Sequence, residues 1–162
     1  MNVLVMGIGN LLLQDEGAGV RVVEEFGRRF LPIPGVHVLD GGTSGIELLS
    51  YLSGRDALIL LDVVRGGLPA GAVSRYEGDA VPALFQQKIS PHQLGISDLL
   101  ATARLMGELP AKVVLFGIEP CSIETGVELT PKVAESVSLV AELVAAELRD
   151  LGVASPPPLS KA

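Results

Sequence analysis

Short apolar runs alternate with helical patterns along most of this 162-residue chain. Three runs are apolar and end at glycine or a polar residue, which is typical of buried strands. A fourth run, which contains His37, is predicted as a further strand. A fifth segment follows a Gly/Pro turn and is a weaker strand candidate. The predicted strands are Val3–Met6, Val36–Leu39, Ala57–Leu61, Gly71–Tyr76 and Val113–Gly117.

Four further segments have helical periodicity or helix-terminal signals. In the first of them, Val20, Val23 and Phe26 are spaced to share one helix face. Thr43 or Ser44 is expected to cap the second helix. The predicted helices are Glu16–Phe30, Ser44–Leu52, Leu94–Met106 and Pro131–Leu151, the last with Thr130 as its N-cap.

The order of these elements predicts the fold class. Alternating strands and helices indicate an α/β protein with a mostly parallel sheet. We therefore expect a three-layer α/β/α fold, in which a twisted five-stranded sheet is flanked by helices. Residues 1–154 form a single domain in this prediction. Residues 155–162 form a flexible tail, because Pro156–Pro158 favours an extended chain.

The composition excludes several classes of protein. The net charge of −7 is opposite to what binding to nucleic acid or to an anionic membrane surface requires. No apolar run has the length of a membrane span, and Met1–Gly7 lacks the basic start of a signal peptide, so a cytoplasmic location is expected. Cys121 is the only cysteine, which rules out a disulfide within the chain and a cysteine-based zinc site. We expect Cys121 to be packed rather than reactive.

Polar residues gather where the predicted strands end. Asp15 and Glu16 follow the first strand, Asp62 directly follows the third, and His92 precedes a predicted helix. In parallel α/β sheets the ligand site lies beyond the carboxyl ends of the strands. We therefore expect these side chains to lie at one edge of the sheet.

Taken singly, most of these residues also have a structural explanation. Asp15 could cap the first helix, and Glu16 could interact only with its positive end. His92 would lie in the first turn after a Ser90–Gln93 capping box, where the helix end favours a neutral imidazole. Asp62 indicates a function most clearly, since a buried carboxylate needs a partner, a metal or a proton. A turn hydrogen bond is the alternative for Asp62.

Two other features of the sequence give only weak evidence of a functional site. Gly7 and Gly9 suggest a dinucleotide loop, but Leu12 stands where the third glycine of that fingerprint belongs. A glycine turn after a buried strand is the better explanation of Gly7. His37 lies within the second predicted strand and is expected to have no functional role.

Two carboxylates and a neutral imidazole form a plausible site for a borderline divalent metal such as nickel or zinc. Three protein ligands leave positions open, which suits recognition or hydrolysis better than a closed structural site. If Glu16, Asp62 and His92 share one ion, their ligand atoms should approach within about 5 Å of one another.

In their order and spacing, several motifs of the chain resemble the nickel–iron hydrogenase maturation endopeptidases. The resemblance extends from the N-terminus to the Pro-rich tail, although Gly117–Cys121 varies in that family. The motifs are Gly7-Ile8-Gly9-Asn10, Asp15-Glu16-Gly17, Asp40-Gly41-Gly42-Thr43-Ser44-Gly45, Asp62 and Ser90-Pro91-His92-Gln93-Leu94-Gly95.

The resemblance implies a monomeric protease that removes the C-terminal extension of the [NiFe] hydrogenase large-subunit precursor after nickel insertion. It implies that Glu16, Asp62 and His92 contact the metal and that nickel arrives with the substrate. Zinc or cadmium could occupy the same site, and no organic cofactor is expected. In the segment 40–45 we predict a peptide-binding loop with Gly41, Gly42 and Thr43; an ordinary strand-to-helix turn is the alternative.

The same three residues would also suit a metal-sensing assembly factor that binds the precursor without cutting it. A small-molecule hydrolase is a third hypothesis, which a deep apolar pocket would favour over a shallow groove. The sequence leaves open whether the protease is of the aspartyl or the metallo type. It also leaves open which hydrogenase is processed and which residues recognise the cleavage sequence.

Overall fold

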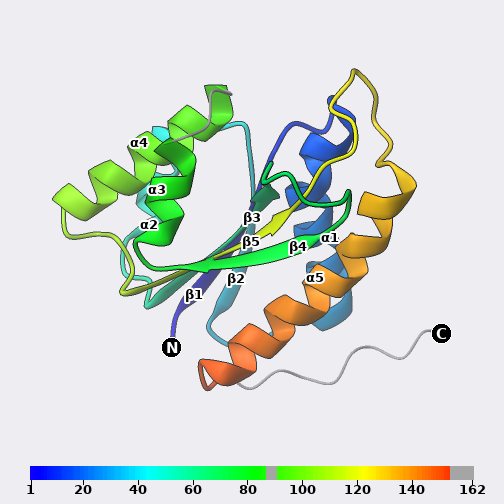
Figure 1. Cartoon of the computed structure of the whole chain (residues 1–162). Helices are drawn as coiled ribbons and strands as arrows, with labels where there is room; N and C mark the ends of the chain where they lie inside the picture. The colour runs from blue at the N-terminus through cyan, green and yellow to red at the C-terminus, as the bar shows by residue number, and fades with distance from the viewer. Residues whose placement is uncertain (87–90, 154–162) are drawn as a thin grey trace.

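The computed structural model describes residues 1–86 and 91–153, with the backbone alone for residues 86 and 91–94. The strands of its sheet are β1 (Val3–Ile8), β2 (Val36–Gly42), β3 (Ala57–Val63), β4 (Val73–Glu77) and β5 (Lys112–Ile118). Their order in the sheet is β2-β1-β3-β5-β4. Neighbouring strands are parallel except β4, which runs antiparallel to β5 (Figure 1). The predicted mostly parallel, five-stranded sheet is therefore confirmed.

Helices cover both faces of the sheet and complete the predicted three layers. One face packs against α1 (Ala18–Phe30) and α5 (Pro131–Asp150) (Figure 1). The other face packs against α2 (Leu49–Leu52), α3 (Ala80–Gln86) and α4 (Pro91–Leu105). Two 3-10 helices precede α1 and α2, namely η1 (Gln14–Gly17) and η2 (Ile46–Leu48). The predicted tail, residues 155–162, lies outside the described residues.

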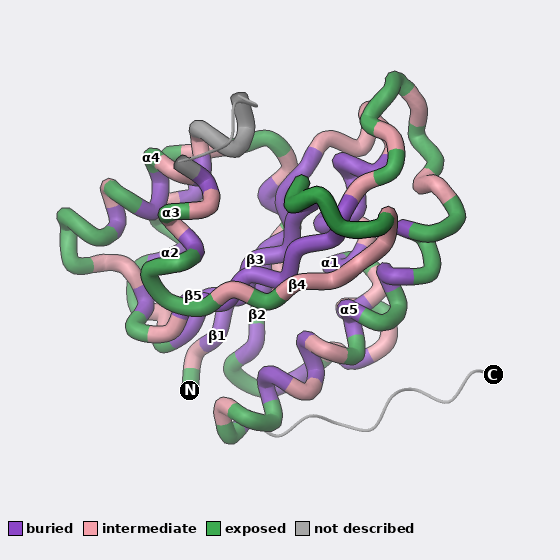
Figure 2. Tube along the Cα trace, viewed as in Figure 1, coloured by how far each residue is buried: buried purple, intermediate pink, exposed green. Residues whose placement is uncertain are grey.

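The central strands are apolar throughout because both of their faces are buried. In β1, Val3 and Val5 belong to the core beneath α1 and α5, whereas Leu4 and Met6 belong to the core beneath α4. Burying one such side chain contributes about 1.5–3 kcal/mol. The central strands are buried in Figure 2, whereas β4 alternates between intermediate and exposed residues at the edge. These two cores hold the sheet in the middle of the molecule.

Several local predictions were wrong. The second helical segment begins as a 3-10 turn with Gly45 at its N-cap and no capping side chain, so Thr43 and Ser44 do not cap it. The segment that begins at Glu16 starts as the 3-10 turn η1, and Asp15 lies inside that turn. Thr130 does occupy the N-cap of α5, but its side chain makes no capping bond.

A close contact between α1 and the sheet lies next to the carboxyl ends of β1 and β3. A Cβ atom placed on Gly19 of α1 would lie 2.2 Å from the carbonyl oxygen of Leu61 and 2.5 Å from that of Ile8. Only glycine lets the helix approach the strands this closely. Within the described part of the chain, no helix combines the length and the apolar character of a membrane span.

Candidate active site at the carboxyl edge of the sheet

The carboxyl ends of β1, β2 and β3 lie side by side and form what we call the carboxyl edge. Gly7 of β1 pairs with Asp40 of β2 on one side and with Leu61 of β3 on the other. The backbone N–H of Gly9 donates to the carbonyl oxygen of Gly42 at 2.9 Å. The residues that follow these strands are therefore brought together, as expected at the carboxyl ends of parallel strands.

Asp62 is the next-to-last residue of β3 and is 1% exposed. Its Oδ1 accepts a hydrogen bond of 2.8 Å from the backbone N–H of Val63. In the sheet register it pairs with Gly117 of β5 and lies one residue beyond the last pair of β1 and β3, Gly7 with Leu61. The prediction of a buried carboxylate at this strand end is therefore confirmed. The local turn hydrogen bond is present as well.

Glu16 lies in η1, which packs against β3, and is 7% exposed. Its backbone is pressed against the first glycine loop, since a Cβ on Gly9 would lie 1.9 Å from the carbonyl oxygen of Glu16. Gly19, one turn further on, touches the carbonyl oxygen of Leu61, the residue before Asp62. The structure thus brings the segments of Glu16 and Asp62 together at the carboxyl edge.

His92 is the second residue of α4, so it lies in the first turn of a helix as predicted. Its side chain lies outside the described part of the structure. The expected approach of the ligand atoms of Glu16, Asp62 and His92 to within about 5 Å of one another therefore stays a prediction. One turn further on, a Cβ on Gly95 would lie 3.2 Å from the Cα of Gly45. The start of α4 is therefore held against the loop that follows β2.

The predicted peptide-binding loop begins in the last residues of β2 and forms a tight turn. The N–H of Gly42 donates to Asp40 Oδ1 at 2.8 Å, and Gly42 has a φ of 51°. Ser44 N–H donates to the carbonyl of Gly41 at 3.0 Å. Thr43 is exposed at the tip, whereas Gly41 is buried. The turn explains the glycine at position 42, and the peptide-binding role of Gly41, Gly42 and Thr43 stays a prediction.

Asp15 is fully buried and binds the segment that follows β5, residues 119–130. Its carboxylate accepts hydrogen bonds from the backbone N–H groups of Cys121, Ser122 and Thr130 and from the Thr130 hydroxyl, at 2.7 to 3.0 Å. Burial opposes ionisation and is the largest single effect. The hydrogen bonds from Ser122, Thr130 and Cys121 together outweigh it and hold the pKa of Asp15 below its ordinary value.

Glu119, directly after β5, is a fourth buried carboxylate near this edge, after Asp62, Glu16 and Asp15. Its Oε2 accepts a hydrogen bond of 2.7 Å from the N–H of Gly66, in the loop that follows Asp62. Its backbone exchanges hydrogen bonds with Gly71 and Ala72 of the same loop. Cys121 nearby is exposed, which contradicts the expectation that it is packed. Sequence reasoning assigned no role to Glu119.

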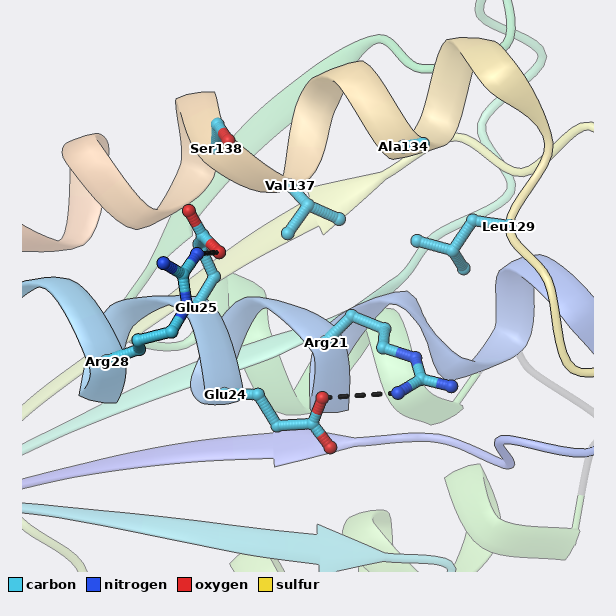
Figure 3. Close-up of a pocket in the computed structure, with 8 residues that line it drawn as sticks. All are labelled: Arg21, Glu24, Glu25, Arg28, Leu129, Ala134, Val137 and Ser138. Atoms are coloured by element: carbon cyan, nitrogen blue, oxygen red, sulfur yellow. Dashed lines mark hydrogen bonds and ion pairs between the residues drawn. The ribbon is translucent and has the colours of Figure 1, made fainter. Parts of the chain in front are cut away.

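A groove of about 460 Å³ lies between α1 and α5 (Figure 3), and neither Glu16 nor Asp62 lines it. Its charged side chains are paired with one another: Arg21 contacts Glu24, and Arg28 contacts Glu25. Among the side chains that the structure describes, no three His, Cys, Asp or Glu residues could hold a metal ion, but His92 is not among them. We therefore base the candidate site on the carboxyl edge.

Two buried acidic residues at the carboxyl edge of an α/β sheet suit an enzyme that handles a metal or a scissile bond. A sequence model of the hydrogenase maturation proteases matches residues 20–147, which include Asp62 and His92 but not Glu16. The chain is 44% identical over 158 residues to the Hydrogenase 2 maturation protease of Escherichia coli, covering 97% of this chain and 96% of that protein. This chain therefore belongs to the hydrogenase maturation protease family.

Solved structures agree with this assignment. The hydrogenase maturating endopeptidase HybD from E. coli matches with a TM-score of 0.94 and 44% identity, over 100% of both chains. The [NiFe] hydrogenase maturation protease HybD from Thermococcus kodakarensis matches with a TM-score of 0.74 and 27% identity, over 91% of this chain and 99% of that one. The family predicted from the motifs, with its fold and its endopeptidase class, is thereby confirmed.

Proposed function

We propose that this chain is an endopeptidase that removes the C-terminal extension of a nickel-loaded [NiFe] hydrogenase large-subunit precursor. Membership of the maturation protease family supports the reaction class and the kind of substrate. The observation that carries the site assignment is the burial of Glu16 and Asp62 on adjoining segments of the carboxyl edge.

The donor set fits a borderline divalent metal. Glu16 and Asp62 would supply carboxylate oxygens, and His92, in the first turn of α4, would supply an imidazole nitrogen. In this proposal the three residues bind nickel that arrives with the precursor, so that only loaded precursor is admitted. Zinc or cadmium are expected to bind the same ligands, and no organic cofactor takes part.

Hydrolysis needs a base and a correctly placed peptide bond. One of the two carboxylates takes a proton from the water that attacks the scissile carbonyl. The nickel of the substrate contributes positive charge beside that water or fixes the bond in place. The loop with Gly41, Gly42 and Thr43 offers backbone groups beside the same edge, and we propose that it holds the extended peptide.

Incubation of the protein with purified nickel-loaded precursor tests the proposal. We expect a shortened large subunit on a denaturing gel and in the mass spectrum, and no cleavage of nickel-free precursor. A stable, uncut complex would instead identify a non-cleaving assembly factor. Gel filtration and cell fractionation test two further parts of the proposal, that the protein is a monomer and acts in the cytoplasm.

A further inference from the structure

Asp15 connects the segment of Glu16 to a distant part of the chain. Its four hydrogen-bond donors all come from Cys121, Ser122 and Thr130, which are 106 to 115 positions away in the sequence. None of the donors belongs to η1 or α1, so the carboxylate does not cap its own helix. A buried carboxylate with this many donors is strongly oriented.

Backbone hydrogen bonds join the same two segments over several residues. The N–H of Asp15 donates to the carbonyl of Ser122 at 3.1 Å, and the N–H of Gln14 donates to that of Gly126 at 2.9 Å. Leu13 and Gly126 form an isolated parallel bridge. Figure 1 shows the segment after β5 lying beside the start of the chain's first helix. The segment after β5 therefore fixes η1 from one side.

The side chains of Asp15 and Glu16 point in different directions from one short 3-10 turn. Successive residues of a 3-10 helix are rotated by about 120°, because it has 3.0 residues per turn. When Asp15 is bound to the segment after β5, the rotation of η1 about its axis is set, and with it the direction of Glu16. The turn η1 also packs against β3, which carries Asp62.

We propose that Asp15 is a positioning residue, whose bonds to Cys121, Ser122 and Thr130 hold the neighbouring Glu16 carboxylate in place at the carboxyl edge. This inference rests on the proposed role of Glu16 in metal recognition. It assigns Asp15 no contact with the metal or with the scissile bond. Its effect on the site passes through Glu16 alone.

A double-mutant cycle separates positioning from a general loss of stability. Calorimetric titration with Cd²⁺ would use the full chain and the variants Asp15→Asn, Glu16→Gln and the double variant, at a temperature below the melting temperature of each. We expect Asp15→Asn to weaken Cd²⁺ binding at least tenfold and to have no further effect in the Glu16→Gln background. Wild-type affinity in Asp15→Asn, or additive losses in the double variant, would overturn the inference.

Two further variants sharpen the comparison. Glu147→Gln removes a buried carboxylate that binds Arg75, far along α5 from the carboxyl edge, and should lower the melting temperature without changing Cd²⁺ affinity. Thr130→Val removes one of the four donors to Asp15, the hydroxyl, and leaves the three backbone donors. If Asp15→Asn does not fold, Thr130→Val takes its place in the cycle, with an expected loss of several-fold. An unchanged affinity in Thr130→Val would then overturn the inference.

The failure of the proposed metal role can be told apart from the failure of this inference. If the wild-type chain does not bind Cd²⁺, metal recognition by Glu16 is refuted, and cleavage of the precursor becomes the readout. A positioning role then predicts a lower kcat for Asp15→Asn with little change in KM, because the reacting groups are misaligned while binding is retained. Wild-type kcat in that variant would refute the positioning role by itself.

Discussion

Because Gly19 lies so close to the sheet, we expect a single methyl group added at this position to lower the stability of the protein. In Gly19→Ala, the new Cβ would lie 2.2 Å from the backbone oxygen of Leu61 and 2.5 Å from that of Ile8. Neither atom is the end of a flexible side chain, so α1 must move away by about 1 Å to reach a tolerable contact. Overpacking of this kind costs about 1–3 kcal/mol.

The same helix contains a matched control. In Gly27→Ala, the nearest atoms to the new Cβ are side-chain carbons of Leu31 and Val38 at 3.8 Å, which is an ordinary contact. Both substitutions improve helix propensity by about 1 kcal/mol. Gly27→Ala should therefore be neutral or stabilising. The difference between the two variants isolates the collision with the strands.

Thermal and urea denaturation measure this difference. In a chain of this size a change of 1 kcal/mol shifts the melting temperature by roughly 2–4 °C, so Gly19→Ala should melt several degrees below Gly27→Ala. Precursor cleavage should fall as well, because Glu16 lies one turn before Gly19 and moves with the helix. A Gly19→Ala variant as stable and as active as Gly27→Ala would refute the packing argument.

Three further predictions follow from individual contacts. Glu147→Gln should lower the free energy of unfolding by about 1–3 kcal/mol in urea titrations, because the buried carboxylate binds two nitrogens of Arg75. The loss is moderated because Arg75 is partly exposed to solvent. Hydrogen bonds from Lys112 and then Arg75 hold the pKa of Glu77 below its ordinary value of 4.5. This stabilisation is present above that value and is lost as the pH falls through the lower folded-state pKa, so Glu77→Gln should flatten stability against pH below about 4.5. Asp62→Ala should abolish precursor processing while the far-ultraviolet circular dichroism spectrum stays that of the wild type; normal processing would exclude Asp62 from the mechanism.

The overall fold could be predicted from sequence because its central strands are buried on both faces. Ala57–Leu61 and Val113–Gly117 are apolar runs, which is typical of strands that are covered on both faces of a sheet. Their true ends lie further on, at Val63 and Ile118, because β3 and β5 keep pairing beyond the apolar run. Pairing with a neighbouring strand leaves no mark on the local sequence, so the ends were predicted too short.

The helix α3 was missed for a related reason. It covers only Ala80–Gln86 and contains Pro82, which is tolerated in a first turn but is usually a breaking signal. Val81 and Phe85, one turn apart, are buried with residues of α4 in the same core. Tertiary packing stabilises this short helix more than its own sequence does.

The candidate site was only partly accessible to sequence reasoning. The rule on strand ends correctly placed Glu16 and Asp62 at one edge, since it depends only on the order of the elements. The same reasoning treated Asp15 as a helix cap, because Asp before a helical pattern is a local signal. Its actual partners, such as Ser122 and Thr130, are more than 100 positions away, and no local pattern can reveal them.

The segment after β5 explains how two acidic residues can be kept at one edge before any substrate binds. Through Asp15 it fixes η1, which carries Glu16, and through Glu119 it fixes the loop that follows Asp62. Glu16 and Asp62 come from different segments, so the surrounding backbone has to hold both in position. A frame built from a third segment can give this support to both. In the function proposed above, the two carboxylates held in this way are those that would bind the metal of the substrate.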